Sequence, residues 1–186
     1  MYESHITVTN IKDEEFKSVC QTLQVKPVII EEDTGSGVRQ TMTARFHKTH
    51  DEKQAFDEMN ELASHFGNRV IRRKLEKIVG KGEMPPHLYL EFHLKYEVPK
   101  NRVKEFVNKV SVLGGHTSQN IIKQANGENV FQFATAREPE VYHRLRDELQ
   151  EFNRINVIRE CVVFDDNPNI DSGWAECKEC IIKQIG

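Results

Sequence analysis

The sequence predicts an α+β protein built as a tandem duplication of one β-α-β-β-α-β unit. Two observations predict the duplication. The motif Glu-x-His occurs at Glu3–His5 and returns at Glu91–His93, and the segment Val-Ile-Arg occurs at 70–72 and returns at 157–159. Both pairs of segments are separated by nearly the same number of residues, which is typical of an internal repeat.

The repeat divides the chain into three parts. We expect a first lobe at 1–83, a second lobe at 84–166, and a C-terminal tail at 167–186 that packs on one of the lobes. This length is sufficient for two small domains, each with a core of its own.

The first lobe begins with a strand at 3–8, in which Ile6 and Val8 occupy one face. A helix at about 13–23 follows, because apolar residues recur there at helical spacing. These apolar residues are Phe16, Val19, Cys20 and Leu23.

The second half of the first lobe contains a hairpin, a helix and a strand. The hairpin turns at Asp33–Gly37, which lacks the Gly-x-x-x-x-Gly-Lys spacing of a phosphate loop. Thr49 and Glu52 have the spacing of a capping box and predict the start of the helix. A strand at 69–79 closes the lobe. The apolar face of the helix consists of Phe56, Met59, Leu62, Ala63 and Phe66.

The second lobe repeats this order. An alternating strand at 88–98 leads to a helix that starts at Pro99 and ends at Gly114 and Gly115. Asn126-Gly127 predicts a hairpin turn between two strands. A helix starting at Pro139 and a strand at 156–164 complete the lobe.

This order of elements is that of the ferredoxin-like fold, in which both helices cover one face of a four-stranded antiparallel sheet. The other face of each sheet is left uncovered. We therefore expect two antiparallel sheets that face each other across a cleft, with the first and last strands of each lobe side by side.

Composition excludes several classes of protein. The net charge is −3 and basic residues form no clear stripe, which argues against nucleic acid as a partner, except as a short oligonucleotide or nucleotide. The sequence contains neither an apolar stretch long enough to span a membrane nor a secretory signal. Four cysteines without such a signal favour a cytoplasmic location.

The alternation of each strand predicts which side chains point to the uncovered face. In the stretch LYLEFHLKYEV, residues 88–98, apolar side chains alternate with Glu91, His93, Lys95 and Glu97. These four polar side chains therefore point to the face of the sheet that the helices do not cover. In the first lobe the predicted polar face consists of Glu3, His5, Thr7, Arg72, Lys74 and Glu76. In the second lobe it includes Glu91, His93, Lys95 and Arg159.

This pattern favours acid–base chemistry on an anionic small molecule. We expect His5 and His93 to be catalytic, each with a pKa raised and a ring oriented by the neighbouring Glu3 or Glu91. Basic and polar neighbours would bind the substrate, with no cofactor required. The predicted substrate-binding residues are Thr7, Arg72, Lys74, Glu76, Lys95 and Arg159.

A metal site is the weaker alternative. Two histidines and two carboxylates are suitable ligands for a divalent ion. The arginines and lysines on the same faces would repel such an ion, so we expect no bound metal.

The C-terminal tail contains Cys177 and Cys180 in a Cys-x-x-Cys arrangement, but the sequence offers no second pair for zinc. Cys20 and Cys161 occupy positions that we expect to be buried. The tail is therefore interpreted as a packed amphipathic segment in which Trp174, the only tryptophan, is the anchor.

Two stretches resemble known families. The segments ESHITV and RRKLE resemble an uncharacterised domain of bacteria and phages that opens with Glu-Ser-His-[Ile/Val]-Thr-Val. That resemblance covers roughly the first lobe. It implies the boundaries of this lobe and the choice of its candidate site residues, but it implies no reaction.

The segment His5-Ile-Thr-Val is similar to the His-x-Thr-x motif of the two-histidine (2H) phosphoesterases. The corresponding segment in the second lobe is His93-Leu-Lys-Tyr, with Lys95 at the threonine position. The resemblance implies two pseudo-symmetric lobes and phosphodiester hydrolysis or ligation by the two histidines.

The sequence thus leaves two functions open. The favoured one is a small-molecule enzyme that acts on a phosphorylated or anionic substrate between the lobes, with phosphoester or nucleotide hydrolysis as the expected reaction. The alternative is a non-catalytic module that binds a ligand or a protein with its polar sheet faces.

Overall fold

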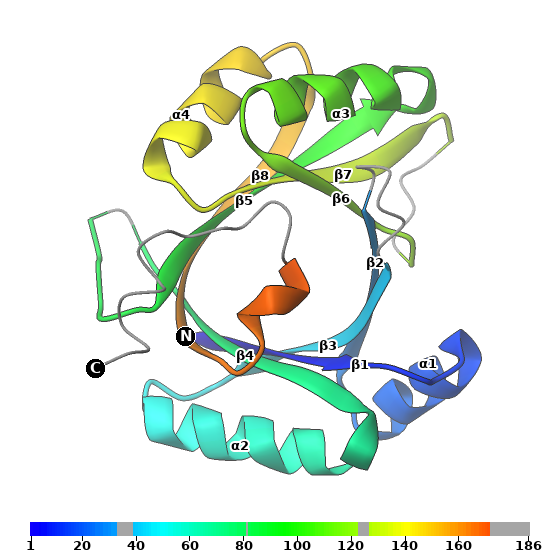
Figure 1. Ribbon diagram of the computed structural model, residues 1–186, viewed down its shortest axis with the longest axis vertical. Coiled ribbons are helices and arrows are strands. Elements are labelled where there is room, and N and C mark those ends of the chain that lie inside the picture. Colours follow the sequence, from blue (N-terminus) through cyan, green and yellow to red (C-terminus); the bar gives the residue numbers. More distant parts are fainter. Residues whose placement is uncertain (33–38, 81, 123–126, 172–186) are drawn as a thin grey trace. The chain divides into compact units, whose positions relative to one another are not determined.

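The computed structural model describes residues 1–32, 39–80, 82–122 and 127–171 (Figure 1). The predicted turn at Asp33–Gly37 and the tail residues Trp174, Cys177 and Cys180 lie outside these ranges. The helices and strands are β1 (Tyr2–Val8), α1 (Asp13–Thr22), β2 (Lys26–Glu32), β3 (Arg39–His47), α2 (Glu52–Ser64), η1 (Gly67–Arg69), β4 (Val70–Ile78), β5 (Tyr89–Pro99), η2 (Lys100–Arg102), α3 (Val103–Val112), β6 (His116–Asn120), β7 (Asn129–Ala136), α4 (Pro139–Glu148), β8 (Asn153–Asp165) and η3 (Pro168–Asp171).

The chain forms two compact units. Within the described ranges, the first unit contains residues 1–29, 40–89 without 81, and 160–171, and the second unit contains the remaining described residues. One continuous strand, β8, therefore contributes its C-terminal half to the first unit and its N-terminal half to the second.

In the first unit, β1 lies between β3 and β4 and pairs antiparallel with both. Helix α2 packs against β1 and β4, so one face of these strands is apolar. Ile6 and Leu75 are fully buried on it, and Phe16 of α1 packs with Phe66 at a ring distance of 6.1 Å. Strand β4 also pairs with β8 through residues 74–78.

In the second unit, β7 lies between β5 and β6, again antiparallel. Helices α3 and α4 pack against β6 and β7 respectively. The core is aromatic: Phe106 of α3 contacts Tyr96 of β5 at 5.2 Å and Phe152 at 5.1 Å between ring centroids. The end of β2 belongs to this unit, and Glu31 pairs with Gln119 of β6.

The helices and strands follow the predicted order, but the predicted fold is wrong. All eight strands pair in the single cyclic order β1-β3-β2-β6-β7-β5-β8-β4, which is a closed barrel. The protein is therefore not a tandem duplication of ferredoxin-like units with two antiparallel sheets facing across a cleft.

The physical reason for the difference lies at the strand edges. The predicted arrangement would leave β2 and β4 as edge strands with unpaired N–H and C=O groups, which is unfavourable unless the edges are covered or paired. In the structure β2 pairs with β6 and β4 pairs with β8. Closure of the ring removes these edges.

Local details of the elements also differ from prediction. The N-cap of α2 is Asp51, whose side chain accepts hydrogen bonds from the backbone N–H groups of Lys53 and Gln54, rather than Thr49. Leu88 precedes β5 and is exposed. Within the described ranges, no helix has the length and apolarity that a membrane span requires.

Candidate functional site

The polar face of β1 and β4 in the first unit is the candidate site. The antiparallel register places Glu3 opposite Glu76, His5 opposite Lys74, and Thr7 opposite Arg72. The six residues predicted for this face are therefore adjacent in space. Except for His5, which is partly exposed, all of them are buried.

His5 is held by contacts on both ring nitrogens. Its Nδ1 lies 3.1 Å from the backbone oxygen of Thr43 on β3, and its Nε2 lies 2.9 Å from a carboxylate oxygen of Glu76. A carbonyl oxygen only accepts hydrogen bonds, so Nδ1 carries a proton. A proton on Nε2 as well makes the ring an imidazolium paired with Glu76.

The surroundings of His5 determine its charge. Burial opposes protonation, but the negative charge of Glu76, its hydrogen bond and the charge of Glu3 together hold the pKa of His5 above its usual value. Lys74 acts in the opposite direction. The net effect favours the charged ring.

Two carboxylates lie near His5: Nε2 is 4.0 Å from Glu3 and 2.9 Å from Glu76. Oxygen atoms of Glu76 and Glu160 lie within 4.8 Å of each other, and the Nζ of Lys74 lies 2.6 Å from Glu76. Burial raises the pKa of Glu3, and the charges of Glu160 and Glu76 raise it further, against the effect of His5. Glu3 therefore binds a proton more readily in the folded protein than an ordinary exposed glutamate does.

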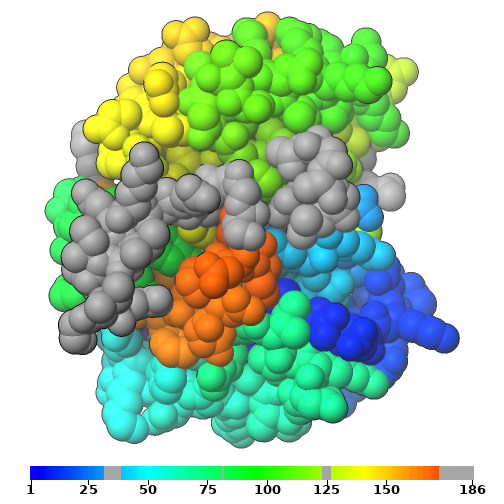
Figure 2. All heavy atoms as spheres, viewed as in Figure 1, coloured from blue at the N-terminus to red at the C-terminus, as the bar shows by residue number. Residues whose placement is uncertain are grey.

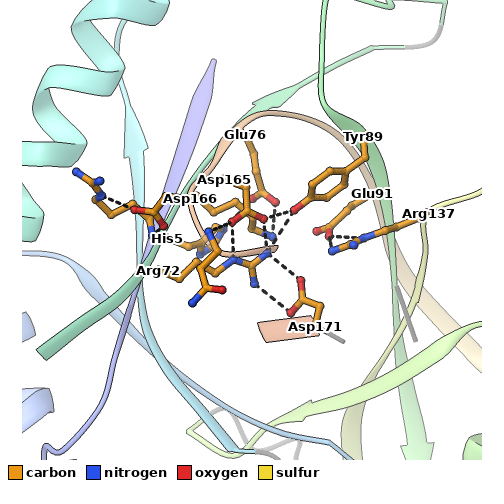
Figure 3. Close-up of polar contacts among 12 residues, drawn as sticks. His5, Arg72, Glu76, Tyr89, Glu91, Arg137, Asp165, Asp166 and Asp171 are labelled. Carbon is orange, nitrogen blue, oxygen red and sulfur yellow. Dashed lines mark hydrogen bonds and ion pairs between the residues drawn. The ribbon is translucent and has the colours of Figure 1, made fainter. Parts of the chain in front are cut away.

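Arg72 belongs to the same face but is bound by two aspartates. Its guanidinium donates to Asp165 at 2.6 and 3.0 Å and to Asp171 at 2.8 and 3.0 Å (Figure 3). No sequence pattern predicted this pairing, because Asp165 and Asp171 lie far from Arg72 along the chain and outside any motif. In the observed structure the charge of Arg72 is thus already countered.

The second unit contains a related but smaller group. Nε2 of His93 lies 3.2 Å from Glu91, and Nδ1 lies 3.0 Å from the hydroxyl of Thr135. Arg137, which follows β7, donates to the other oxygen of Glu91 at 2.8 Å. Sequence reasoning missed Arg137 because it lies between a strand and a helix, where alternation predicts nothing.

The two remaining predicted substrate-binding residues contact aromatic rings of the second unit. The Nζ of Lys95 lies 3.7 Å from the ring centroid of Phe131, and the guanidinium carbon of Arg159 lies 5.9 Å from that of Phe92. Thr7 of the first unit is buried beside Arg72 in the strand register.

One further chain of polar residues was missed by sequence reasoning. His47 of β3 contacts Ser4 of β1 through Nε2 and Glu58 of α2 through Nδ1, both at 2.8 Å. The order serine, histidine, carboxylate is that of a hydrolytic triad. Ser4 is fully buried, however, and only Glu58 reaches solvent, so the arrangement links α2 to the sheet rather than exposing a nucleophile.

The described cysteines, Cys20 and Cys161, are both buried, as predicted. Burial raises the pKa of Cys20 to about 11, so its thiol stays protonated and unreactive at neutral pH. Neither residue belongs to the candidate site.

These contacts assign most predicted site residues to one polar face in each unit. The sequence matches neither a protein-family model nor a curated protein.

Proposed function

We propose that the protein is a small-molecule enzyme that acts on a phosphorylated or otherwise anionic substrate, with His5 as its acid–base group. The observation that carries this proposal is the pair of contacts on His5. Because Nδ1 is committed to the carbonyl of Thr43, the other nitrogen, Nε2, is the one that exchanges protons. Glu76 lies at Nε2 and stabilises the protonated state.

The exposure of the charged groups supports an anionic substrate. The side chains of His5 and Lys74 retain 17% and 11% exposure, whereas that of Glu76 retains 1%. A ligand that approaches this face therefore meets two cations, and the carboxylate that orients them lies beneath. Charge-assisted hydrogen bonds to an imidazolium and an ammonium favour phosphate or carboxylate groups.

The chemistry that fits this arrangement is proton donation to a departing oxygen. An imidazolium at neutral pH is a general acid, and after donating its proton it is able to accept one from water. Lys74 would stabilise the negative charge that develops on a phosphoryl group. Phosphoester hydrolysis is therefore the reaction to test first.

The experiment combines turnover with ligand binding. Hydrolysis of 4-nitrophenyl phosphate and bis(4-nitrophenyl) phosphate is compared between the wild type, His5→Gln and the surface control His65→Gln. We expect His5→Gln to lose roughly 10²–10⁴-fold in kcat and the control to retain activity. The ring resonances of His5 should shift in NMR spectra when inorganic phosphate is added.

The alternative function is a non-catalytic module that binds a ligand or a protein. Arg72, Lys74 and Arg137 each contact a carboxylate of their own unit, which favours a structural role for these cations. Phosphate binding at His5 without turnover of either ester would favour this alternative. Absence of both binding and turnover would reject the anionic-ligand proposal altogether.

A further inference from the structure

We propose that Arg72 is a binding subsite for the carboxylate or phosphate group of a ligand, and that the chain's own Asp171 occupies this subsite in the observed structure. The inference rests on the proposed function in one respect, since it assumes the same anionic class of ligand. It adds a second contact residue and a reason why the site is closed.

The guanidinium of Arg72 is engaged on two edges. Nε and Nη2 donate to the two oxygens of Asp165 at 3.0 and 2.6 Å. Nη1 and Nη2 donate to the two oxygens of Asp171 at 3.0 and 2.8 Å. Figure 3 shows the guanidinium between the two carboxylates. Both are bidentate contacts, the geometry with which arginine recognises carboxylate and phosphate groups.

Asp165 is a fixed partner of Arg72. It belongs to β8, its side chain is 1% exposed, and the hydroxyl of Tyr89 donates to it at 2.5 Å. The backbone N–H of Asn167 donates to its other oxygen at 3.1 Å. These contacts hold Asp165 in place whatever occupies the second edge of Arg72.

Asp171 is held by a much smaller element. It is the last residue of η3, a short 3₁₀ helix that follows β8, and its contact with the amide of Gln40 is long, at 3.4 Å. Short 3₁₀ helices have weak internal hydrogen bonds. In the space-filling view the orange residues at the end of the described chain lie at the surface (Figure 2). The element that carries Asp171 is thus not part of any strand of the first unit.

The charge balance favours exchange over a permanent pair. Two carboxylates share one buried guanidinium, so Asp165 alone already neutralises Arg72. Asp171 adds a negative charge whose burial is unfavourable unless each of its hydrogen bonds is made. An external carboxylate or phosphate is able to make the same two contacts to Nη1 and Nη2.

The subsite lies next to the proposed acid–base group. Arg72 is opposite Thr7, and His5 is two residues further along the same strand, with its side chain on the same face. This spacing along a strand is roughly 7 Å. A ligand that replaces Asp171 would therefore place its anionic group beside His5, and η3 would act as a strap that closes the site in the ligand's absence.

The test compares Asp171→Asn with Asp166→Asn. Asp166 lies in the same segment but contacts Arg73 at 2.7 Å rather than Arg72, so its substitution leaves both contacts between Asp171 and Arg72 in place. Affinity for inorganic phosphate and for acetate is measured by calorimetry in separate titrations. We expect Asp171→Asn to bind one or both anions at least about tenfold more tightly than the wild type, and Asp166→Asn to match the wild type.

A second measurement uses the wild-type chain, so it does not depend on the folding of a variant. Binding of the anion should expel η3, and the backbone amides of residues 169–171 should then exchange with deuterium faster. The amides of β4 should keep their protection.

The outcomes separate this inference from the proposed function. An unchanged anion affinity in Asp171→Asn, or an equal gain in anion affinity in both variants, would contradict the proposal that Asp171 occupies the subsite. A gain in Asp171→Asn for acetate alone assigns the subsite to a carboxylate, and a gain for phosphate alone assigns it to a phosphate group. Tighter binding without any response of the His5 resonances would support the subsite while contradicting His5 as the acid–base group.

Discussion

At the scale of single residues, the partner of a charged side chain decides what it is able to do. His5 and Arg72 lie on the same face of neighbouring strands, and alternation predicts this for both. His5 pairs with a glutamate through Nε2, whereas Arg72 is engaged by two aspartates. The same surface therefore holds both the proposed acid–base group and the proposed anion subsite.

The first prediction concerns the charge on His5. Glu76→Gln removes the negative charge and the strongest acceptor at Nε2, so the pKa of His5 should fall. An NMR titration of the His5 ring resonances measures this pKa directly. Glu58→Gln is the matched control, because Glu58 contacts His47 instead. A His5 pKa that is equal in wild type and Glu76→Gln would show that Glu76 does not stabilise the imidazolium.

At the scale of elements, buried polar contacts fix how helices sit on strands. Ser4 of β1, His47 of β3 and Glu58 of α2 form a continuous chain of hydrogen bonds through the apolar face of the first unit. A buried histidine is costly unless both ring nitrogens have partners. The contacts therefore favour one placement of α2 over others that bury the same apolar residues.

The second prediction tests this link. Ser4→Ala removes the partner of the His47 Nε2 and should lower the free energy of unfolding by about 1–3 kcal/mol, because a buried nitrogen then lacks its hydrogen bond. Urea unfolding measures the change. Lys53→Ala breaks an exposed pair with Asp57 on the same helix and should change stability far less than Ser4→Ala does. Equal effects of the two substitutions would show that the hydrogen bonds joining Ser4, His47 and Glu58 do not stabilise the fold.

The second unit offers a similar test with a glycine. A Cβ built on Gly115, which leads into β6, would lie 2.8 Å from a methyl group of Leu145 and 3.0 Å from one of Val110. Both contacts are with buried core residues, so Gly115→Ala should cost about 1–3 kcal/mol. Gly80→Ala is the control, since its nearest contact is a Glu83 side chain at 3.4 Å. Thermal or urea unfolding that ranks Gly80→Ala as the worse variant would contradict the packing.

At the scale of the whole molecule, the closed order of strands depends on two strand pairings, β2 with β6 and β4 with β8. Neither pairing is part of the predicted two-lobe arrangement. Glu31 of β2 pairs with Gln119 of β6, and residues 74–78 of β4 pair with β8. Each pairing satisfies backbone groups that would otherwise be exposed at an edge.

The β2–β6 pairing is testable by a cross-link. Directly opposed residues in an antiparallel pair are close enough for a disulfide. In a background with serine at positions 177 and 180, Glu31→Cys combined with Gln119→Cys should oxidise readily, giving a faster band on a non-reducing gel. Glu31→Cys with Ser118→Cys shifts the second thiol to the other face of the strand and should oxidise poorly. Cross-linking that is equal in both pairs would contradict the register.

The stability of the whole molecule should depend on pH through His5 and Glu3. Both groups have a raised pKa in the folded protein. The folded state then holds more protons than the unfolded state, so the contribution of each group is greatest below its ordinary pKa and is lost as pH rises through the folded value. The contribution of Glu3 is lost from about pH 4.5 upwards, and that of His5 from about pH 6.5 upwards.

The measurement is the free energy of unfolding in urea from pH 6 to pH 9. The wild type should become less stable as the pH rises, and His5→Gln should show a smaller slope. His65→Gln is again the control for loss of an exposed histidine. A wild-type stability that rises across this range, or an unchanged slope in His5→Gln, would show that His5 is not held in its charged form.

The sequence by itself determined the order of the helices and strands and the face on which His5, Lys74 and Glu76 lie. These features follow from local periodicity: a strand alternates every two residues and a helix repeats every 3.6, whatever the rest of the chain does. The pairing of β1 with β4, which places Glu3 and His5 beside Lys74 and Glu76, was also predicted correctly.

Only the tertiary structure decided how strand edges pair and which charges meet. The pairing of β2 with β6, the two aspartates on Arg72 and the arginine on Glu91 each join residues that are distant in sequence. No local pattern encodes such contacts, because their energy depends on which buried groups remain unsatisfied once the chain has folded. The closed strand order and the pairing of Arg72 with two aspartates both follow from that requirement.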